Sequence, residues 1–208
     1  MDGPRQREAV ETDRVLALSD GVIAIAITLL VLDLSVPTLP PGSPFSTFPE
    51  LVVEQWSELL GFVSSFLVVG FYWTLHRRTF VYIERHERGV VYLNLCFLLA
   101  VAFVPYATSV FTTYPGSVGP TFLSVVLALT GLTMALLWIY ADRVDIIESG
   151  LASRTVRIQA ARFLASPLVF TTAAFVGLVS PFAAVACWFL LVPINAVLES
   201  RLVASLEP

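Results

Sequence analysis

The chain has 208 residues, of which 57% are hydrophobic and 13% charged, and its formal net charge is -4. Soluble domains carry about 25% charged and about 45–50% apolar residues, so a water-soluble fold of this length could not bury the excess apolar surface. The composition therefore predicts an all-α integral membrane protein with one domain over residues 1–208 and the lipid bilayer as a partner. No basic patch is present, so we expect no nucleic-acid partner.

Six apolar stretches qualify as membrane-crossing helices, since one crossing takes about 20 mostly apolar residues. In chain order they cover residues 15–36, 59–75, 90–111, 120–140, 160–179 and 181–198. Only Ser180 and Pro181 separate the last two stretches. This spacing predicts a tight hairpin between antiparallel neighbours.

Two of the connecting segments have patterns of their own. Residues 37–57 are rich in proline, and we expect a short helix from about Pro49. Between Arg143 and Arg162, apolar residues recur at helical spacing among charges. Either the fourth and fifth helices extend beyond the membrane there, or the segment is a connector lying on the headgroups.

The arginines give the orientation of the chain. All 12 Lys and Arg residues are arginines, and they occupy alternate connections: Arg5, Arg7, Arg14, Arg77, Arg78, Arg85, Arg88, Arg143, Arg154, Arg157, Arg162 and Arg201. With six crossings they all fall on one face, and short cytoplasmic loops are enriched in basic residues. We therefore expect both termini in the cytoplasm of a multi-pass protein of the cell membrane. The exclusive use of arginine hints at a GC-rich prokaryotic genome, so we expect this membrane to be a prokaryotic plasma membrane.

Signatures of catalysis are missing. The sequence has no H-E-x-x-H, G-x-S-x-G, Walker A or dinucleotide-binding pattern, and Cys96 and Cys187 lie apart in apolar stretches. We predict no enzyme, no catalytic residue, no cofactor and no structural metal site. The chain also lacks T-V-G-Y-G, the carbonyl-lined filter of ordinary potassium channels.

The first apolar stretch carries unusual polar residues, because Ser19 and Asp20 lie inside its run. A carboxylate at that depth is costly and needs partners or water. One interpretation is a buried polar network of Arg14, Ser19 and Asp20 with Trp73, His76 and Asn94, which share the expected depth. The alternative is that Ser19 and Asp20 cap a helix that starts later. In that case Trp73 is an interfacial aromatic, His76 a solvated helix end and Asn94 a lone interhelical hydrogen bond.

The pattern Arg14-x-x-x-Leu18-Ser19-Asp20, followed by a helix rich in Ala and Ile that ends Thr-Leu-Leu-Val-Leu-Asp-Leu, resembles the transmembrane protein 175 family of potassium channels, in its prokaryotic branch. Phe71-Tyr72-Trp73-x-x-His76 resembles the family pattern on the second helix. Leu18 stands where the family has Phe, which leaves the polar members of the motif intact.

This resemblance implies a homotetramer of six-helix subunits in which the first helix of each subunit lines a central pore. It implies conduction of K+, with weaker permeation by other monovalent cations, through a constriction of aliphatic side chains. By its position relative to Asp20, Ile25 resembles that constriction. Thr28, Leu29 and Leu32 follow at helical spacing on the same face.

The physics of such a pore is coherent, since a hydrophobic neck gates by dewetting. We expect Thr28 hydroxyls to offer oxygens to a transient, partly dehydrated K+, with only modest discrimination against Na+. Whether a proton leak accompanies the K+ current is left open. An ordinary apolar helix facing lipid or core is the other interpretation of the stripe. A secondary transporter of a small solute or cation, and a non-conducting scaffold, are the alternative functions.

Overall fold

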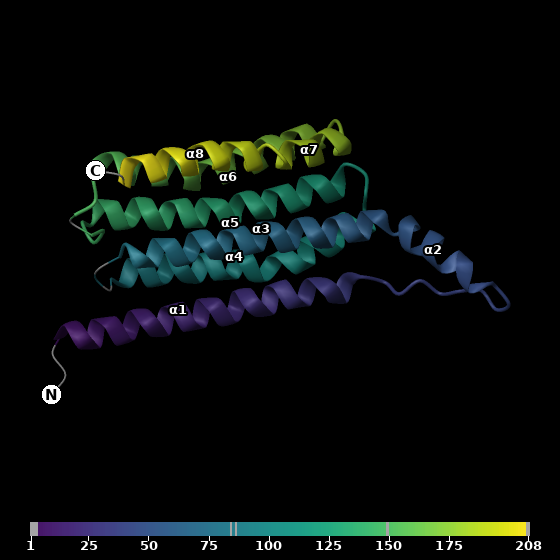
Figure 1. The fold of residues 1–208 in the computed structure, drawn as a ribbon, viewed down its shortest axis with the longest axis horizontal. Coiled ribbons are helices and arrows are strands. Elements are labelled where there is room, and N and C mark those ends of the chain that lie inside the picture. The colour runs from purple at the N-terminus through teal and green to yellow at the C-terminus, as the bar shows by residue number, and fades with distance from the viewer. Residues whose placement is uncertain (1–3, 84, 86, 149, 207–208) are drawn as a thin grey trace.

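The computed structural model describes residues 4–83, 85, 87–148 and 150–206, and within these ranges the chain is a bundle of long helices (Figure 1). The uninterrupted long helices are α1 (Pro4–Leu29), α3 (Trp56–Val81), α4 (Arg88–Thr113), α5 (Val118–Arg143) and α6 (Ser153–Gly177). The last crossing is divided into α7 (Pro181–Trp188) and α8 (Leu191–Leu206), and a short α2 (Phe48–Glu54) precedes α3.

Six segments are long and apolar enough to cross a membrane: Asp13–Asp33, Trp56–Val81, Arg88–Thr113, Val118–Arg143, Ser153–Gly177 and Pro181–Ala204. This confirms the predicted all-α fold with six membrane-spanning helices. Most helices extend beyond the predicted apolar stretches, because polar residues at headgroup depth continue the helical backbone. The first stretch differs at its far end, where α1 passes at Leu29 into a 3-10 helix (Leu30–Asp33).

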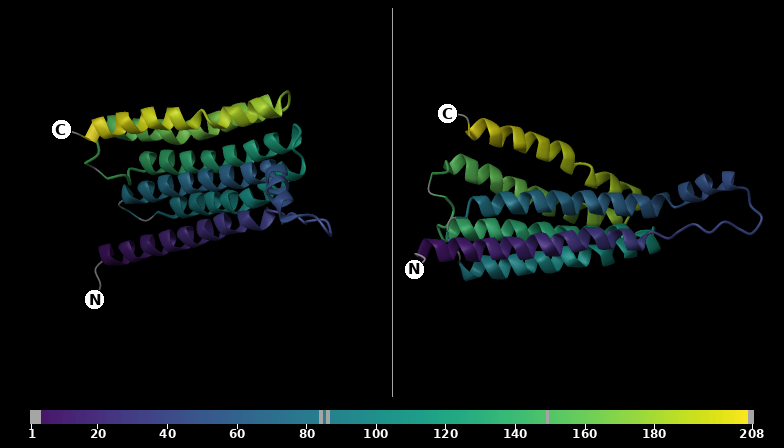
Figure 2. Two further views of the ribbon diagram at one scale, coloured as in Figure 1. Left: turned by 45° about the vertical axis from the view of Figure 1, so that its right-hand side comes forward. Right: turned by 60° about the horizontal axis from the view of Figure 1, so that its bottom comes forward.

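Both termini lie at the same end of the bundle, as an even number of crossings requires (Figures 1 and 2). Arg77 and Arg78 lie in the last turns of α3, Arg143 ends α5, and Arg154 lies in the first turn of α6. These positions are at the same end as the termini. The side chains of Arg5 and Arg7 lie outside the described residues. These four arginines therefore lie at one end of the folded bundle, as the sequence predicts.

The core of the bundle is built around α5, which packs against α4 and α6. Trp138 on α5 stacks at a tilt on Phe163 of α6, with 5.6 Å between ring centroids. The hydroxyl of Tyr72 on α3 donates to the Leu127 carbonyl oxygen (2.8 Å) and also contacts the Ser166 hydroxyl. Polar side chains in the core are thus paired across helices, as burial in an apolar environment demands.

The sixth crossing is broken between Trp188 and Leu191. Proline lacks the N–H that would bond to the carbonyl four residues earlier, so Pro193 leaves the Phe189 carbonyl without its usual partner. The Val192 N–H donates to that carbonyl instead, at 3.2 Å, in a tighter turn. The predicted hairpin before this crossing is confirmed, with the Ser180 hydroxyl accepting from the Ala183 N–H at the start of α7 (3.3 Å).

The connections at the arginine-bearing end are tied to each other. Ile83 and Ile147 form an antiparallel bridge, and the Glu148 N–H donates to the Tyr82 carbonyl (2.9 Å). The Arg85 guanidinium donates to the Asp145 carbonyl (3.0 Å). Each of the two interpretations of residues 143–162 holds for part of the segment. Helix α6 already begins at Ser153, before the predicted apolar stretch, whereas α5 ends at Arg143 and a connector follows it.

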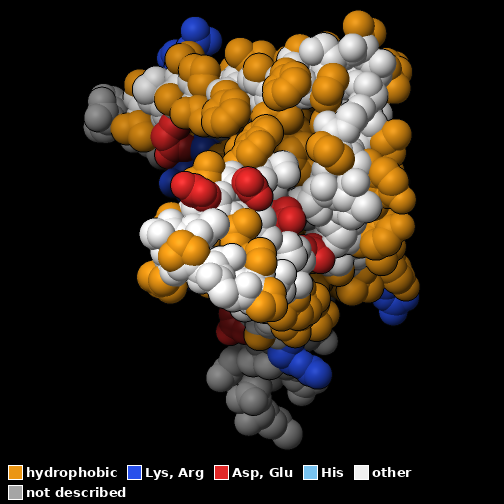
Figure 3. All heavy atoms as spheres, turned by 90° about the vertical axis from the view of Figure 1, so that its right-hand side faces the viewer, with side chains coloured by type: hydrophobic (Ala, Val, Ile, Leu, Met, Phe, Trp, Pro, Cys, Tyr) orange, Lys and Arg blue, Asp and Glu red, His pale blue; other side chains and the backbone are white. Residues whose placement is uncertain are grey.

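The opposite end of the bundle carries α2, and acidic side chains gather on this end face (Figure 3). The predicted short helix is present, with Pro49 in its first turn. Glu58 at the start of α3 accepts hydrogen bonds from the backbone and hydroxyl of Ser35 (2.8–3.0 Å), and the Gln55 amide donates to the Ser35 carbonyl (3.0 Å). These bonds tie the end of the first crossing to α3.

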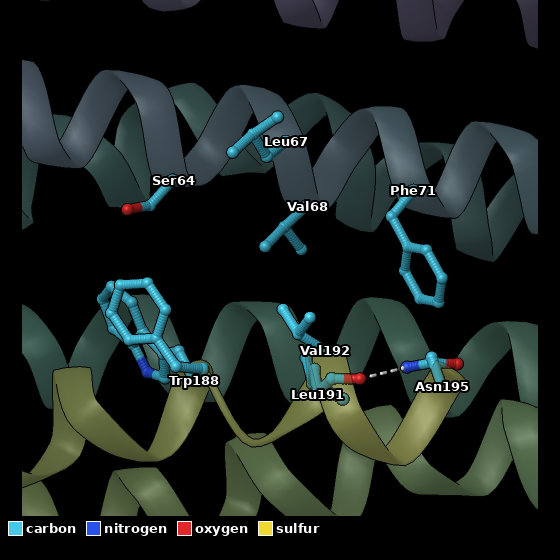
Figure 4. Close-up of a pocket in the computed structure, with 9 residues that line it drawn as sticks. Ser64, Leu67, Val68, Phe71, Trp188, Leu191, Val192 and Asn195 are labelled. Atoms are coloured by element: carbon cyan, nitrogen blue, oxygen red, sulfur yellow. Dashed lines mark hydrogen bonds between the residues drawn. The ribbon is translucent and has the colours of Figure 1, made fainter. Parts of the chain in front are cut away.

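A cavity of about 230 Å³ lies between α3 and the two halves of the last crossing (Figure 4). Val68 and Phe71 point into it from α3, opposite Val192 on α8. Its polar members are Ser64 and Asn195, and the amide of Asn195 donates to the Leu191 carbonyl of its own helix (2.9 Å). The lining is therefore suited to apolar groups and offers a hydrated ion few oxygens.

Candidate functional site

The way α1 packs in the bundle defines the candidate site. One face of α1 packs against α4 and α3, and its buried apolar members are Ile23, Ala26 and, where the 3-10 helix begins, Leu30. These positions are three and four residues apart, which places them on one side of a helix with about 100° per residue. The opposite side of α1 is therefore not covered by the other helices that the structure describes.

Hydrogen bonds between side chains join α1 to both neighbours near the arginine-bearing end. Ser19 is fully buried, and its hydroxyl accepts from the Asn94 amide of α4 (2.9 Å) while donating to the Val15 carbonyl (2.8 Å). The other end of the Asn94 amide accepts from His76 Nε2 of α3 (2.7 Å). The structure thus brings Ser19, His76 and Asn94 together in one buried chain of hydrogen bonds.

His76 is enclosed on all sides. Its ring stacks on Phe97 of α4 at 5.2 Å and lies 4.7 Å from the ring of Phe80. Its Nδ1 is buried without a hydrogen-bond partner among the described residues. The alternative of a solvated helix end is therefore wrong for His76. Asn94, with two partners, is more than a lone interhelical hydrogen bond.

Asp20 is half-buried next to the hydrogen-bonded residues Ser19, Asn94 and His76, and it accepts from a different donor. The indole Nε1 of Trp73 donates to Asp20 Oδ1 at 2.7 Å. The guanidinium of Arg77, one turn further along α3, lies 5.4 Å from the centroid of the Trp73 ring. The Arg77 cation is attracted to the face of the Trp73 ring, and the N–H of the same indole donates to the Asp20 carboxylate. Arg77 is not among the site residues predicted from the sequence, although its spacing of four residues from Trp73 could have indicated the contact.

Two expectations for this region are corrected. The alternative in which Ser19 and Asp20 cap a later helix is wrong, because α1 is already helical from Pro4. Arg14 does not join the network in the single chain: its side chain is exposed and has no hydrogen bond or ion pair with another described residue. Asp20 is six positions after Arg14, so the two lie about 120° apart around the helix.

The unpartnered side of α1 carries the four residues predicted to form a constriction. Ile25 is 60% exposed, Leu29 43% and Leu32 75%, and Thr28 is exposed as well. Leu18 and Gly21 continue the same exposed stripe toward the arginine-bearing end. The hydroxyl of Thr28 donates to the Ile25 carbonyl (2.9 Å), so its oxygen keeps free lone pairs on the exposed side.

A second ionic cluster was not found from the sequence. Glu199 on α8 pairs with Arg78 of α3 at 2.7 Å and also with Arg162 of α6, whose side chain is only 4% exposed. The three residues are far apart in the chain, so no spacing rule could have joined them. The cluster holds α8 against α3 and α6 at the end where the termini lie.

Residues 14–105 match a family model described as the endosomal/lysosomal potassium channel TMEM175. A potassium channel of Streptomyces collinus is 37% identical over 139 residues, which cover 64% of this chain and 66% of the relative. A potassium channel of Chamaesiphon minutus is 37% identical over 107 residues, covering 51% of this chain and 52% of the relative. The chain thus spans just under two thirds and about half of the length of these two relatives.

A solved structure is similar over a longer range. The crystal structure of a lysosomal potassium-selective channel TMEM175 homolog from Chamaesiphon minutus has a TM-score of 0.76 to this chain at 26% identity. The match covers 91% of this chain and 98% of the other. The similarity of fold therefore extends beyond residues 14–105, the segment that the family model matches.

Proposed function

Because the chain belongs to the TMEM175 family, we propose that it is a potassium channel whose pore is lined by the exposed side of α1. The prediction that the chain is not an enzyme is confirmed by the family, because the family model and the two bacterial relatives named above are described as channels. The proposal concerns the conduction path, its assembly and its selectivity.

The observation that carries the proposal is the one-sided burial of α1. Its Ile23 side is packed against α4 and α3, while its Ile25 side is free. Hydrogen bonds from Asn94 and Trp73 fix the rotation of α1 about its own axis. An interhelical hydrogen bond in a membrane contributes about 0.6 to 2 kcal/mol. The polar network therefore determines which residues α1 presents to a neighbouring copy.

Assembly as a homotetramer gives this free side its partner. Four copies of α1 around a common axis would converge at Ile25, and four Ile side chains would form a narrow, dry neck. A neck of this kind excludes ions by dewetting and conducts when a small tilt of the helices widens it. Leu29 and Leu32, one and two turns further along, extend the apolar lining.

Thr28 supplies the oxygens for a transient K+ in this pore. Its hydroxyl hydrogen is already donated to the Ile25 carbonyl, so a cation meets only the oxygen lone pairs. K+ sheds its hydration water more readily than Na+, so a ring of hydroxyl oxygens favours K+ modestly. The channel is thus proposed to be weakly selective for K+ over other monovalent cations. The flux experiment below also measures whether protons pass.

The orientation in the membrane follows from the arginines. They lie at the end of the bundle that also holds both termini. Under the positive-inside rule that end is cytoplasmic. The acidic end face around Asp33, Glu50 and Glu54 is then external, where negative charge raises the local concentration of cations.

A secondary transporter is the second candidate, because interrupted helices often mark transporter binding sites. The break between Trp188 and Leu191 is such an interruption. It borders the apolar cavity of Figure 4, however, and that lining offers few groups to hold a polar substrate. The observation therefore favours a packing role for the break.

The test is ion flux through the purified full-length protein in liposomes and planar bilayers under K+ and Na+ gradients, with a pH-sensitive dye for protons. We expect rapid dissipative K+ flux that exceeds Na+ flux. Ile25→Asn should wet the neck and raise the basal K+ current at least tenfold. Saturating flux coupled to a second solute would indicate the transporter.

The matched control is Leu129→Asn, which makes the same kind of change at a side chain of α5 that is 51% exposed. This variant should conduct like the unmodified protein. Equal currents from Ile25→Asn and the unmodified protein would remove Ile25 as the constriction. A complex of other than four subunits in native mass spectrometry would contradict the tetramer.

A further inference from the structure

A cavity of about 330 Å³ lies between the first turns of α6 and the last turns of α8. Its lining residues include Arg154, Arg157 and Arg201 together with the apolar Ile158, Ala161 and Leu198. The cavity is at the end of the bundle that carries the termini, where both helices leave the apolar span. Its depth is therefore that of the lipid headgroups.

The described part of the chain provides no counter-ion for the arginines of this cavity. None of its three arginines forms an ion pair with another described residue. Glu199, next to Leu198 on α8, is already engaged by Arg78 and Arg162. Unpaired guanidinium groups that converge on a cavity attract an oxyanion, and they bind phosphate by paired hydrogen bonds.

Arg157 also borders a neighbouring cavity lined by Asp142, Asp145 and Glu148. Its guanidinium can turn toward either side. Arg154 and Arg201 border only the basic cavity of the two, so they carry the charge argument.

The backbone of α6 adds to the attraction. Helix α6 begins at Ser153, and its N-cap residue, Ala152, has no side chain that can accept from the first N–H groups. The first N–H groups of a long helix lack partners inside the helix and favour a negative charge. Ser153 lines this cavity and also the neighbouring acidic one.

The apolar part of the lining points to the source of the anion. Ile158 and Ala161 follow Arg154 at four and seven residues, so they lie on the same side of α6. The same side continues into the span at Leu168, which is 65% exposed. A basic headgroup site that opens onto an exposed apolar helix face matches a phospholipid, whereas a free phosphate would make no use of that face.

We propose that this cavity binds the phosphate headgroup of an anionic phospholipid of the cytoplasmic leaflet, with an acyl chain lying along α6. Basic pockets between membrane helices on the cytoplasmic side commonly hold anionic headgroups. The inference is independent of conduction, because the cavity lies on α6 and α8 and uses no residue of α1. Its failure would leave the channel proposal untouched.

Native mass spectrometry of the full-length protein, titrated with dioleoyl phosphatidylglycerol or dioleoyl phosphatidylcholine, tests the proposal. We expect one phosphatidylglycerol per subunit, bound at least tenfold more tightly than phosphatidylcholine. Arg154→Gln with Arg201→Gln should weaken phosphatidylglycerol binding about fivefold for each arginine removed. The same two positions changed to Lys should retain most of the affinity.

The matched control is Arg143→Gln, which removes an exposed arginine at the same end but outside the cavity. It should bind phosphatidylglycerol like the unmodified protein. Equal binding of the two lipids, or equal losses in the control and the double variant, would overturn the proposal. Displacement of the lipid by millimolar inorganic phosphate would identify a free phosphate as the ligand and would also overturn it. Circular dichroism of each variant checks that the fold is intact.

Discussion

Replacement of Asn94 by Leu tests whether side-chain hydrogen bonds hold α1 in place. Asn94 is 1% exposed and connects Ser19 of α1 with His76 of α3. Leu has the same branched arrangement of side-chain heavy atoms, so the change removes both hydrogen bonds without opening a cavity. Ser19 keeps its bond to the Val15 carbonyl, whereas His76 is left with no partner for either ring nitrogen among the described residues.

The expected cost follows from these contacts. Two interhelical hydrogen bonds within a membrane contribute about 1 to 4 kcal/mol together. A buried donor left without a partner costs about 1 to 3 kcal/mol, and part of this is already included in the lost bond. We therefore expect Asn94→Leu to lower the free energy of unfolding by about 2 to 4 kcal/mol.

The measurement is reversible unfolding in mixed micelles by titration with sodium dodecyl sulfate, followed by far-ultraviolet circular dichroism. The control is Asn195→Leu, since the Asn195 amide bonds only to the Leu191 carbonyl of its own helix and its Oδ1 is buried without a partner. The control should change the stability by less than about 1 kcal/mol. Equal losses of unfolding free energy in the two variants would refute the idea that this hydrogen-bond network holds α1 in place.

Two further changes test the packing of the other helices. Glu199→Gln leaves Arg162 as a buried charge without its counter-ion and should cost about 3 kcal/mol. Glu54→Gln, at an exposed position on α2, should be neutral in the same titration, and similar losses in both would count against the ion-pair cluster. Gly131→Ala should cost about 1 to 3 kcal/mol, because the added methyl would lie within 3.0 Å of side-chain atoms. Gly70→Ala meets no atom within 4 Å and should be neutral or stabilising, so equal effects would contradict the close packing at Gly131.

Much of the fold could be predicted from local patterns. Hydropathy identified the six spans, Ser180 and Pro181 identified the hairpin, and Pro49 identified the short α2. These features depend on properties of neighbouring residues, which a sequence displays directly. The break in the last span is harder to predict. Pro193 lies inside an apolar run, but a kink and a full interruption look alike in sequence.

The polar residues of the site could be predicted from the sequence, but the hydrogen bonds between them could not. Ser19, Asp20, Trp73, His76 and Asn94 were grouped by their expected depth, and the structure pairs them by hydrogen bonds. Depth gives no rotation about the helix axis, so the sequence did not distinguish them from Arg14, which is exposed. The four-copy pore stays a prediction that the flux and mass measurements test.

The sequence by itself determined the environment, the number of spans and their common polarity, because free energy of transfer into lipid is a sum over the residues of each segment. Only the tertiary structure decided which side of each helix is buried, which distant charges pair and where cavities remain. Those properties depend on the rotation and contact of helices far apart in the chain. The exposed side of α1 and the basic cavity beside α6 both arise at that level.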